Sequence, residues 1–249
     1  MEKTGKKLVI DIGNSRAKLA VFQGSQLQEQ WIWPQWEVKD FNALATNQNP
    51  SFIILSNVAG RKGDEIAACF QDAPFFINLT AQTPLPVINA YETPETLGKD
   101  RLAAVVGAWE LYPKQHSLVV DAGTCITYDL LDAGGVYRGG NIAPGLQMRL
   151  RAMHEFTAGL PLVSMKDIDQ WVGYSTESAI RNGALLGAIL EIQAFSDWRR
   201  QQIDQLNVIL TGGDAVYFAK NWKRKIFVHP NLVLIGLNKI LDYNVSLLE

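Results

Sequence analysis

One short pattern occurs twice in this chain, and it constrains the fold more than any other feature. Leu8–Ser15 reads as an apolar run, an aspartate, a glycine and small polar residues, and Leu118–Thr124 repeats that order. The two aspartates, Asp11 and Asp121, lie 110 positions apart in a chain of 249 residues. Each half therefore opens with a strand that ends in an Asp-x-Gly turn, which indicates a duplicated structural unit.

The likeness between the halves continues beyond the turns. Each turn is followed by two more strand candidates, at 18–22 and 27–33 in the first half and at 126–131 and 136–142 in the second. The remaining pattern predicts strands at 52–55, 208–210 and 226–228, and helices at 101–112, from 146, at 177–200 and at 238–248. Alternating strands and helices predict an α/β fold. We expect two similar lobes, 1–115 and 116–249, and leave open whether the last helix packs on the first lobe.

Composition excludes several classes of protein. The hydrophobic fraction of 47% is that of a globular protein and excludes wholesale disorder. A formal net charge of −2 argues against sequence-independent binding of nucleic acid. Two cysteines, Cys69 and Cys125, make no disulfide framework and indicate a reducing compartment. The basic start of the chain is followed by no apolar leader segment, and the apolar run 184–190 is far shorter than a membrane span. We expect a soluble cytoplasmic protein that binds neither nucleic acid nor membrane.

The first candidate site is the segment 11–18, Asp-Ile-Gly-Asn-Ser-Arg-Ala-Lys. Gly13 lets the backbone approach a phosphate and point N–H groups at it, and Lys18 supplies a cation. Asp11 suits Mg²⁺ held through water, because Mg²⁺ keeps most of its hydration and takes one or two carboxylates plus phosphates. Neither common phosphate-loop motif occurs. Alone, the segment also fits a strand-ending Asx turn, but two such turns fit a cleft that clamps a polyphosphate from both sides.

Three further stretches carry polar or glycine-rich turns. Asp100 and Arg101 follow a glycine at the start of a helical run, where a carboxylate is favoured by the helix dipole and an arginine can grip a second carboxylate. A helix cap with a surface ion pair explains the same residues. The glycine turns 139–145 and 211–214 either shape a ligand site or are a hairpin exit and a simple β-turn.

Six blocks of the sequence resemble the type III pantothenate kinase family. In chain order they are DIGNS, TPETLGKDRL, VVDAGTCITYD, GGNIAPGLQM, GYSTESAIRNG and TGGD, and they extend over most of the chain. The family belongs to the superfamily of acetate kinases, sugar kinases, heat-shock cognate ATPases and actin. The resemblance implies two duplicated ribonuclease-H-like lobes of the actin-like ATPase type around a central cleft. It also implies ATP-dependent phosphorylation of pantothenate to 4′-phosphopantothenate, the first step of coenzyme A biosynthesis.

The resemblance further implies roles for individual residues. Asp100 is the expected base that takes the proton from the pantothenate hydroxyl. The expected ATP site consists of Asp11, Ile12, Gly13, Asn14, Ser15, Arg16, Ala17, Lys18 and Thr124. The expected pantothenate site consists of Tyr91, Gly98, Lys99, Asp100, Arg101 and Thr176. Asp121 is the expected ligand of a monovalent cation, K⁺ or NH₄⁺, and Asp11 of Mg²⁺ through water. Family members are typically homodimers.

Departures from the family pattern are mild. Ser15 stands where threonine is common, Lys99 where a small residue is frequent, and Cys125 where alanine is usual. Two other readings stay open at this stage. One is a non-catalytic nucleotide-binding relative, such as an accessory factor for transcription. The other is another enzyme of the superfamily, such as a sugar kinase or exopolyphosphatase, although those lack the TPETLGKDRL block.

Overall fold

The computed structural model describes residues 5–57, 60, 62–168 and 170–248. Residues 1–4 of the basic N-terminal segment thus lie outside the described part. The chain divides into two compact units, one formed by 1–114, 131–139 and 231–249 and the other by 115–130 and 140–230. These units are defined by spatial contacts and are discontinuous in sequence. The boundary between two duplicated lobes at 115 and 116 stays a prediction.

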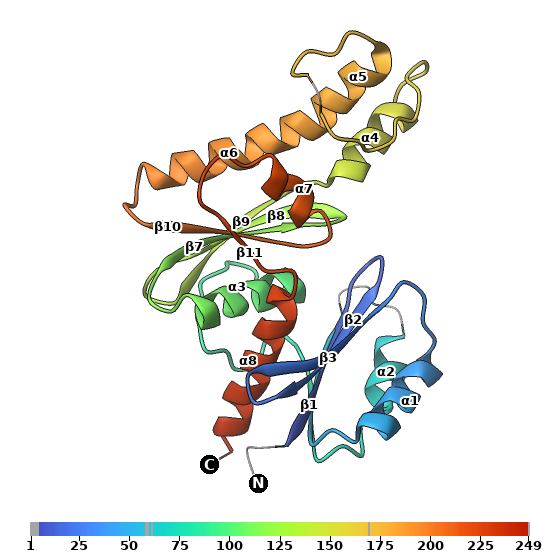
Figure 1. Cartoon of the computed structure of the whole chain (residues 1–249). Helices are drawn as coiled ribbons and strands as arrows, with labels where there is room; N and C mark the ends of the chain where they lie inside the picture. Colours follow the sequence, from blue (N-terminus) through green and yellow to red (C-terminus); the bar gives the residue numbers. More distant parts are fainter. Residues whose placement is uncertain (1–4, 58–59, 61, 169, 249) are drawn as a thin grey trace. The chain divides into compact units, whose positions relative to one another are not determined.

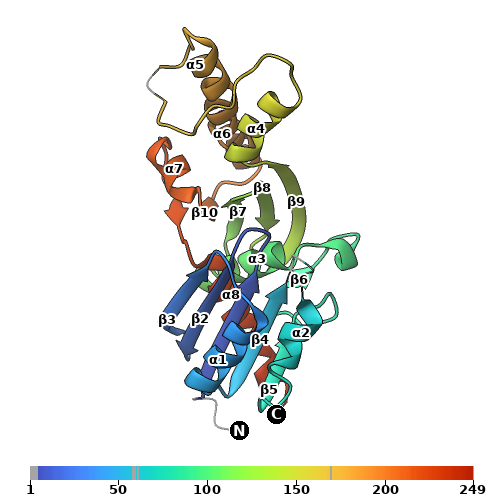
Figure 2. The ribbon, with the colours of Figure 1, turned by 90° about the vertical axis from the view of Figure 1, so that its right-hand side faces the viewer.

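The first unit contains a five-stranded sheet in the order β3-β2-β1-β4-β5 (Figure 2). β1 pairs antiparallel with β2, and β2 pairs antiparallel with β3, whereas β4 and β5 continue the sheet in parallel. The strands are β1 (Lys6–Ile12), β2 (Ala17–Gln23), β3 (Gln26–Trp33), β4 (Phe52–Asn57) and β5 (Phe75–Asn78). Parallel strands need crossover connections, and two helices, α1 (Val38–Gln48) and α2 (Gly63–Ala68), supply them.

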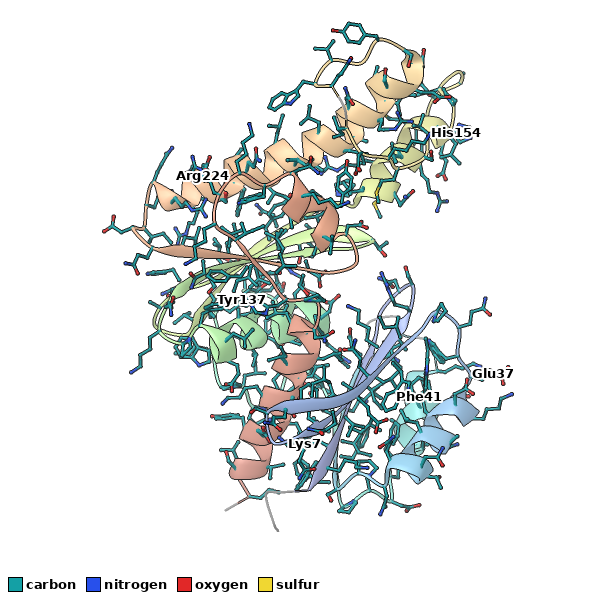
Figure 3. The ribbon with its side chains drawn as sticks, viewed as in Figure 1. Lys7, Glu37, Phe41, Tyr137, His154 and Arg224 are labelled. Atoms are coloured by element: carbon teal, nitrogen blue, oxygen red, sulfur yellow. The ribbon has the colours of Figure 1, made fainter. Side chains whose placement is uncertain are left out.

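The alternation of side chains along β1 explains why helices cover both faces of this sheet. Leu8 and Ile10 join a core with Phe41 of α1 and residues of α2. The intervening residues face the other side, where α8 (Leu232–Ser246) packs on β1 and β4 (Figures 2 and 3). On that side Lys7, only 2% exposed, pairs with Asp242 of α8 and donates to the carbonyl oxygen of a β2–β3 turn residue at 2.9 Å. This buried cation ties the last helix to the first strand.

Two glycines set the close crossing of α8 and α3 (Lys99–Leu111), which lie side by side in the first unit (Figure 1). A β-carbon on Gly236 would lie 1.8 Å from the carbonyl oxygen of Ala103, and one on Gly107 would lie 2.3 Å from that of Leu232. Side chains larger than hydrogen therefore do not fit at this crossing. The last helix, α8, thus packs closely on α3, whose first turn contains Asp100 and Arg101.

The sheet of the second half repeats the strand order of the first. Its order is β11-β10-β7-β8-β9-β6, so that β9-β8-β7-β10-β11 corresponds to β3-β2-β1-β4-β5. β7, β10 and β11 pair in parallel, as β1, β4 and β5 do. The strands are β6 (Ile88–Asn89), β7 (His116–Ala122), β8 (Cys125–Leu131), β9 (Val136–Pro144), β10 (Leu206–Thr211) and β11 (Phe227–Val228). The duplication inferred from the sequence, and with it the two-lobed α/β fold class, is confirmed.

Helices of the second unit cover one face of its strands (Figure 1). Side chains of β7, β8 and β10 form a core with residues of α4, α5, α6 and α7. The helices are α4 (Leu146–Glu155), α5 (Thr176–Arg181), the π-helical turn η2 (Asn182–Leu186), α6 (Gly187–Arg200) and α7 (Ala215–Lys220). Ser175 caps α5, since its hydroxyl accepts the N–H of Ser178 at 3.2 Å.

Several predicted element boundaries were wrong. The segment expected as one helix at 177–200 contains the π-turn η2, because an apolar period of 3.6 residues does not distinguish α from π turns. The last helix begins at Leu232, six residues before the predicted start. β9 runs through Pro144, so most of the glycine-rich loop expected at 139–145 is strand. Within the described residues, no helix combines the length and apolar character needed to cross a membrane.

Candidate functional site

The first predicted turn joins two paired strands of the first unit. Asp11 is the second-last residue of β1 and lies directly opposite Lys18 of β2. Asp11 is buried, with 7% of its surface exposed, whereas residues 14–16 are exposed. The N–H of Gly13 donates to the carbonyl oxygen of Arg16 at 3.0 Å and closes the turn. The turn therefore presents small polar side chains and a guanidinium above a buried carboxylate with a lysine across from it.

Two members of this segment face the interior. Ile12 and Ala17 are fully buried in the core that α1 and α2 cover. Their side chains pack against protein, so only their backbone atoms are available to a ligand. Within the segment expected to bind ATP, residues 14–16 and 18 thus offer side-chain donors, 12, 13 and 17 offer backbone groups, and Asp11 offers a buried carboxylate.

Asp121 occupies the equivalent place in the second unit. It is the second-last residue of the seven-residue strand β7, as Asp11 is of the seven-residue strand β1. Asp121 pairs in register with Thr211 of β10, and Asp11 pairs with Ser56 of β4. Both aspartates thus end a central strand and lie beside a hydroxyl-bearing residue of the next parallel strand. The sequence duplication is therefore also a duplication of position.

Two other glycine turns of the second unit meet the turn that follows Asp121. The N–H of Asp214 donates to the carbonyl oxygen of Ala122 at 2.9 Å, and the N–H of Gly145 donates to that of Thr124 at 3.2 Å. A β-carbon on Gly145 would lie 2.4 Å from the same Thr124 oxygen, and one on Gly212 would lie 2.3 Å from the Ala122 oxygen. The three motifs, separate in sequence, therefore form one backbone-lined site, with Thr124 exposed on it.

The N-terminus of α3 presents the predicted catalytic carboxylate. Asp100 lies in the first turn of the helix, and its Oδ1 accepts the backbone N–H of Arg101 at 2.8 Å. Gly98 is the residue before the helix, and its carbonyl oxygen accepts the N–H of Leu102 at 3.2 Å. A carboxylate at this end of a helix is stabilised in its charged form by the helix dipole. The carboxylate is thus oriented by its own backbone and is partly open to solvent.

Arg101 is buried, and its guanidinium lies against an aromatic ring. Its residue surface is 5% exposed, and its guanidinium carbon lies 5.6 Å from the centroid of the Tyr91 ring. Tyr91 stacks on Tyr137 with a centroid distance of 6.0 Å and an interplanar angle of 12°. The side-chain oxygen of Asn89 accepts the N–H of Tyr91 at 3.1 Å. The stack of Tyr91 on Tyr137 thus places an aromatic face against the guanidinium of Arg101, the residue that follows Asp100.

The remaining predicted residues lie at two helix starts. Lys99 is the first residue of α3, and partial burial holds the pKa of its ammonium below the ordinary lysine value. Thr176 is the first residue of α5 and is exposed. Tyr91, Gly98, Lys99, Asp100 and Arg101 all belong to the first unit, as does the turn after Asp11. Asp121, Thr124 and Thr176 belong to the second unit.

Most of this chain matches a known protein family. The model of the type III pantothenate kinase family matches residues 7–197, which include most of the residues described above.

The chain belongs to the type III pantothenate kinase family.

Relatives of this family match nearly the whole chain. The type III pantothenate kinase of Phocaeicola vulgatus is 44% identical over 241 residues, covering 96% of this chain and 99% of the relative. That of Bacteroides fragilis is 43% identical over 237 residues, covering 95% and 98%. The resemblance drawn from the six sequence blocks is thereby confirmed.

Solved structures support the fold. The Baf family transcriptional activator from Campylobacter jejuni superposes with a TM-score of 0.65 at 23% identity, covering 96% of this chain and 99% of that one. The ROK hexokinase from Thermus thermophilus reaches a TM-score of 0.53 at 15% identity, with the same coverage. At these identities the likeness concerns the fold alone. The likeness agrees with the duplicated two-sheet α/β architecture of this chain.

Sequence reasoning did not single out several residues that shape these sites. Tyr137 lies in a predicted strand, but nothing in its neighbours indicates that it stacks on Tyr91, 46 positions earlier. Arg149 and Glu191 are bonded to each other at 2.7 Å across 42 positions. The strand register of β6 on β9, which pairs Asn89 with Tyr137, is the structural cause of the first contact. The register of one strand on a distant strand is not determined by the residues next to it in sequence.

Proposed function

We propose that this chain transfers the γ-phosphoryl group of ATP to the primary hydroxyl of pantothenate and forms 4′-phosphopantothenate and ADP. The observation that carries the proposal is the family match over 7–197 together with 44% identity along 96% of the chain. The product is the first intermediate on the route from pantothenate to coenzyme A. An ATP-dependent kinase requires a divalent metal ion with its nucleotide.

Asp100 is the base in this proposal. The hydroxyl oxygen of pantothenate forms a new bond to phosphorus, the bond between phosphorus and the leaving oxygen of ADP breaks, and the hydroxyl proton passes to the Asp100 carboxylate. Because the transition state of phosphoryl transfer is loose, positioning contributes more than basicity. The 2.8 Å bond from the Arg101 N–H to Oδ1 supports this role, since it orients the carboxylate. A positioned base contributes roughly 10²–10⁴-fold to rate.

Tyr91, Gly98, Lys99, Arg101 and Thr176 bind pantothenate in this proposal. Pantothenate carries a carboxylate, and the guanidinium and ammonium groups at the start of α3 are its natural partners. The Tyr91–Tyr137 stack supports an anchoring role for Arg101, because it restricts the guanidinium before substrate arrives. Lys99 is partly desolvated, which strengthens its attraction for an anion.

The turn 11–18 and Thr124 bind the ATP phosphates in this proposal. Residues 14–16 offer exposed donors, and Lys18 adds a cation beside Asp11. The glycines at 145 and 212, which lie against the turn 121–124, leave its backbone groups without side chains in the way. This arrangement suits polyphosphate recognition through many short contacts rather than through a single phosphate loop.

The donor sets fit the ions that the proposal requires. Asp11 is a single buried carboxylate at a strand end, and Mg²⁺ typically uses one or two carboxylates, water and phosphate oxygens. Asp121 is half-buried, and a β-carbon at 212 would lie 2.4 Å from its Oδ1 and 2.3 Å from the Ala122 carbonyl oxygen, so a carboxylate oxygen and a carbonyl oxygen, both hard donors, lie near the same point. When bound, these ions neutralise phosphate charge. Asp11 is the proposed ligand of Mg²⁺ through water, and Asp121 that of K⁺ or NH₄⁺.

We also propose a homodimer in the cytoplasm. Large apolar side chains are exposed along one segment of the second unit, namely Phe156 at 84%, Leu162 at 60%, Trp171 at 66%, Val172 at 63% and Tyr174 at 83%. Exposed apolar groups at this density are typical of protein contact surfaces. Light scattering coupled to size exclusion measures the mass of the assembly directly, and a monomer at working concentrations would contradict this part of the proposal.

One assay tests the function. Purified protein is incubated with Mg-ATP, K⁺ and pantothenate, and the products are identified by mass. We expect 4′-phosphopantothenate and ADP in equal amounts. If no phosphorylated pantothenate forms at any substrate concentration although the protein binds nucleotide, the proposal is wrong and a non-catalytic nucleotide-binding protein of the same fold is favoured.

A further inference from the structure

A three-residue network in the second unit joins its long helix, α6, to the strand β8 and the helix α4. Glu191 lies in α6 and uses both carboxylate oxygens: Oε1 accepts the hydroxyl of Tyr128 at 2.6 Å, and Oε2 accepts an Nη of Arg149 at 2.7 Å. Tyr128 comes from β8 and is 2% exposed, and Arg149 comes from α4 with its side chain 18% exposed. Charge-assisted bonds of this length are among the stronger ones in proteins.

The second contact of Arg149 points toward the candidate nucleotide site. Its Nε donates to the carbonyl oxygen of Pro144 at 2.8 Å, so one guanidinium bridges α6 and the last residue of β9. The backbone N–H of Arg149 also donates to the carbonyl oxygen of Gly145 at 3.0 Å. The peptide at 144–145 is therefore held from the α4 side by the side chain and the backbone of the same residue.

This peptide is seated directly on the turn that carries Thr124. The N–H of Gly145 donates to the Thr124 carbonyl oxygen at 3.2 Å, and a β-carbon at 145 would lie 2.2 Å from the carbonyl oxygen of Gly123. A side chain at 145 therefore has no room here, and the 3.2 Å hydrogen bond couples the position of residues 144–145 to that of the turn 121–124. The path from Glu191 to the turn runs through two hydrogen bonds and one backbone contact, all inside one unit.

The contacts of Arg149 differ from those of a neighbouring arginine on the same helix, Arg151. Arg151 and Glu155 form an ion pair on the same helix, with side chains 66% and 50% exposed. Exposed pairs at this spacing contribute only a few tenths of a kcal/mol. Arg149, in contrast, leaves its helix to bind a backbone carbonyl and a carboxylate of another helix. Burial, followed by the bond to Glu191, raises the pKa of Tyr128 far above its ordinary value, so its hydroxyl remains a donor at all working pH values.

We propose that Arg149, oriented by Glu191 and Tyr128, is a positioning residue that sets the nucleotide- and cation-binding turn 121–124 through Pro144 and Gly145. The inference rests on the proposed function, since it assigns ATP to this turn. It adds a residue that touches neither substrate. Its consequence is selective. The affinity for nucleotide depends on Arg149, whereas the affinity for pantothenate does not, because the residues proposed for pantothenate lie at Tyr91, at the start of α3 and at Thr176, and none of them belongs to the turn 121–124.

The test compares Arg149→Met with Arg151→Met, which removes an exposed arginine two residues away on the same helix. We expect Arg149→Met to raise KM for ATP and the K⁺ concentration for half-activation by about tenfold, as loss of an outer orienting partner does. KM for pantothenate stays within about twofold, and Arg151→Met leaves all three constants unchanged. Titration calorimetry with ADP gives the same ordering without turnover.

Tyr128→Phe provides a second variant, because it removes one hydroxyl and keeps the ring in the core. It is expected to weaken ADP binding in the same direction but less than Arg149→Met. Thermal unfolding identifies variants that fold. A folded Arg149→Met protein with unchanged ADP affinity, or with equal losses for ADP and pantothenate, would overturn the inference. Inactivity of the unaltered protein toward pantothenate would instead contradict the proposed function, while the ADP titrations still decide the role of Arg149.

Discussion

The carboxylate of Asp100 folds back over Gly98, so that a β-carbon at position 98 would lie 2.6 Å from Asp100 Oδ1. The same oxygen accepts the N–H of Arg101 at 2.8 Å. The glycine therefore makes room for the orientation of the proposed base. A substitution here acts on the position of a carboxylate and not on the core.

Gly98→Ala is expected to lower kcat by about 10-fold to 100-fold while leaving stability nearly unchanged. The methyl group meets the flexible end of a side chain, which can rotate away, but the rotated carboxylate no longer faces the hydroxyl. The backbone angle at 98 suits alanine, with φ at −58°. Steady-state kinetics and thermal unfolding on the same preparation check this. A wild-type kcat would show that the orientation of Asp100 does not matter.

Asp100→Asn is expected to remove most turnover, by roughly 10²–10⁴-fold, and to leave ATP binding nearly intact. The amide keeps the shape and one acceptor oxygen but takes up no proton. Rapid-quench measurement of product formation, with ADP titration as the control, separates the two effects. Near-wild-type kcat in this variant would remove Asp100 from the role of base.

Gly236→Ala is expected to destabilise the protein by about 1–3 kcal/mol, because its methyl group meets the Ala103 carbonyl oxygen at 1.8 Å and the two helices must separate. Gly187→Ala is the matched control. Gly187 is also in a helix, but a β-carbon there meets nothing within 4 Å, so alanine is expected to stabilise by roughly 0.5–1 kcal/mol. Urea unfolding curves give both changes in the free energy of unfolding. If the two changes had the same sign, the close crossing of α3 and α8 would not require glycine at 236.

Turnover is expected to need K⁺ or NH₄⁺ if Asp121 binds a monovalent cation. Rates measured in Na⁺-only buffer should fall strongly and return when K⁺ is added. Asp121→Asn should weaken this response, because the amide carries no charge. Undiminished rates in Na⁺-only buffer would eliminate the cation role of Asp121.

The local parts of the site could be predicted from the sequence. Asp11 and Asp121 were placed at strand ends because an apolar run followed by Asp-x-Gly has few other conformations, and both lie there. The start of α3 near Asp100 was predicted for a similar reason, since a glycine followed by an acidic first turn is typical of a helix N-terminus. The duplication was predicted as well, whereas the order of the strands in each sheet was not.

Contacts between distant segments could not be predicted in this way. The stack of Tyr91 on Tyr137 depends on the register of a two-residue strand, and the π-turn at 182–186 interrupts a helix whose apolar period gives no sign of it. Lys7 and Asp242 are 235 positions apart, and the residues next to them in sequence do not indicate that they pair. The pair forms because α8 packs on β1. These features follow from the path of the whole chain.

The sequence by itself determined the duplicated α/β plan, the family and the residue types that carry the chemistry. These properties depend on neighbours within a few positions, where backbone preferences and hydrophobic period act directly. Only the tertiary structure decided that residues 145 and 212–214 meet the turn 121–124, that the Tyr91 ring lies against the Arg101 guanidinium, and that Arg149 connects α6 to Pro144. Those contacts join segments that are distant in sequence, so they form only when the buried surfaces of a whole unit pack together.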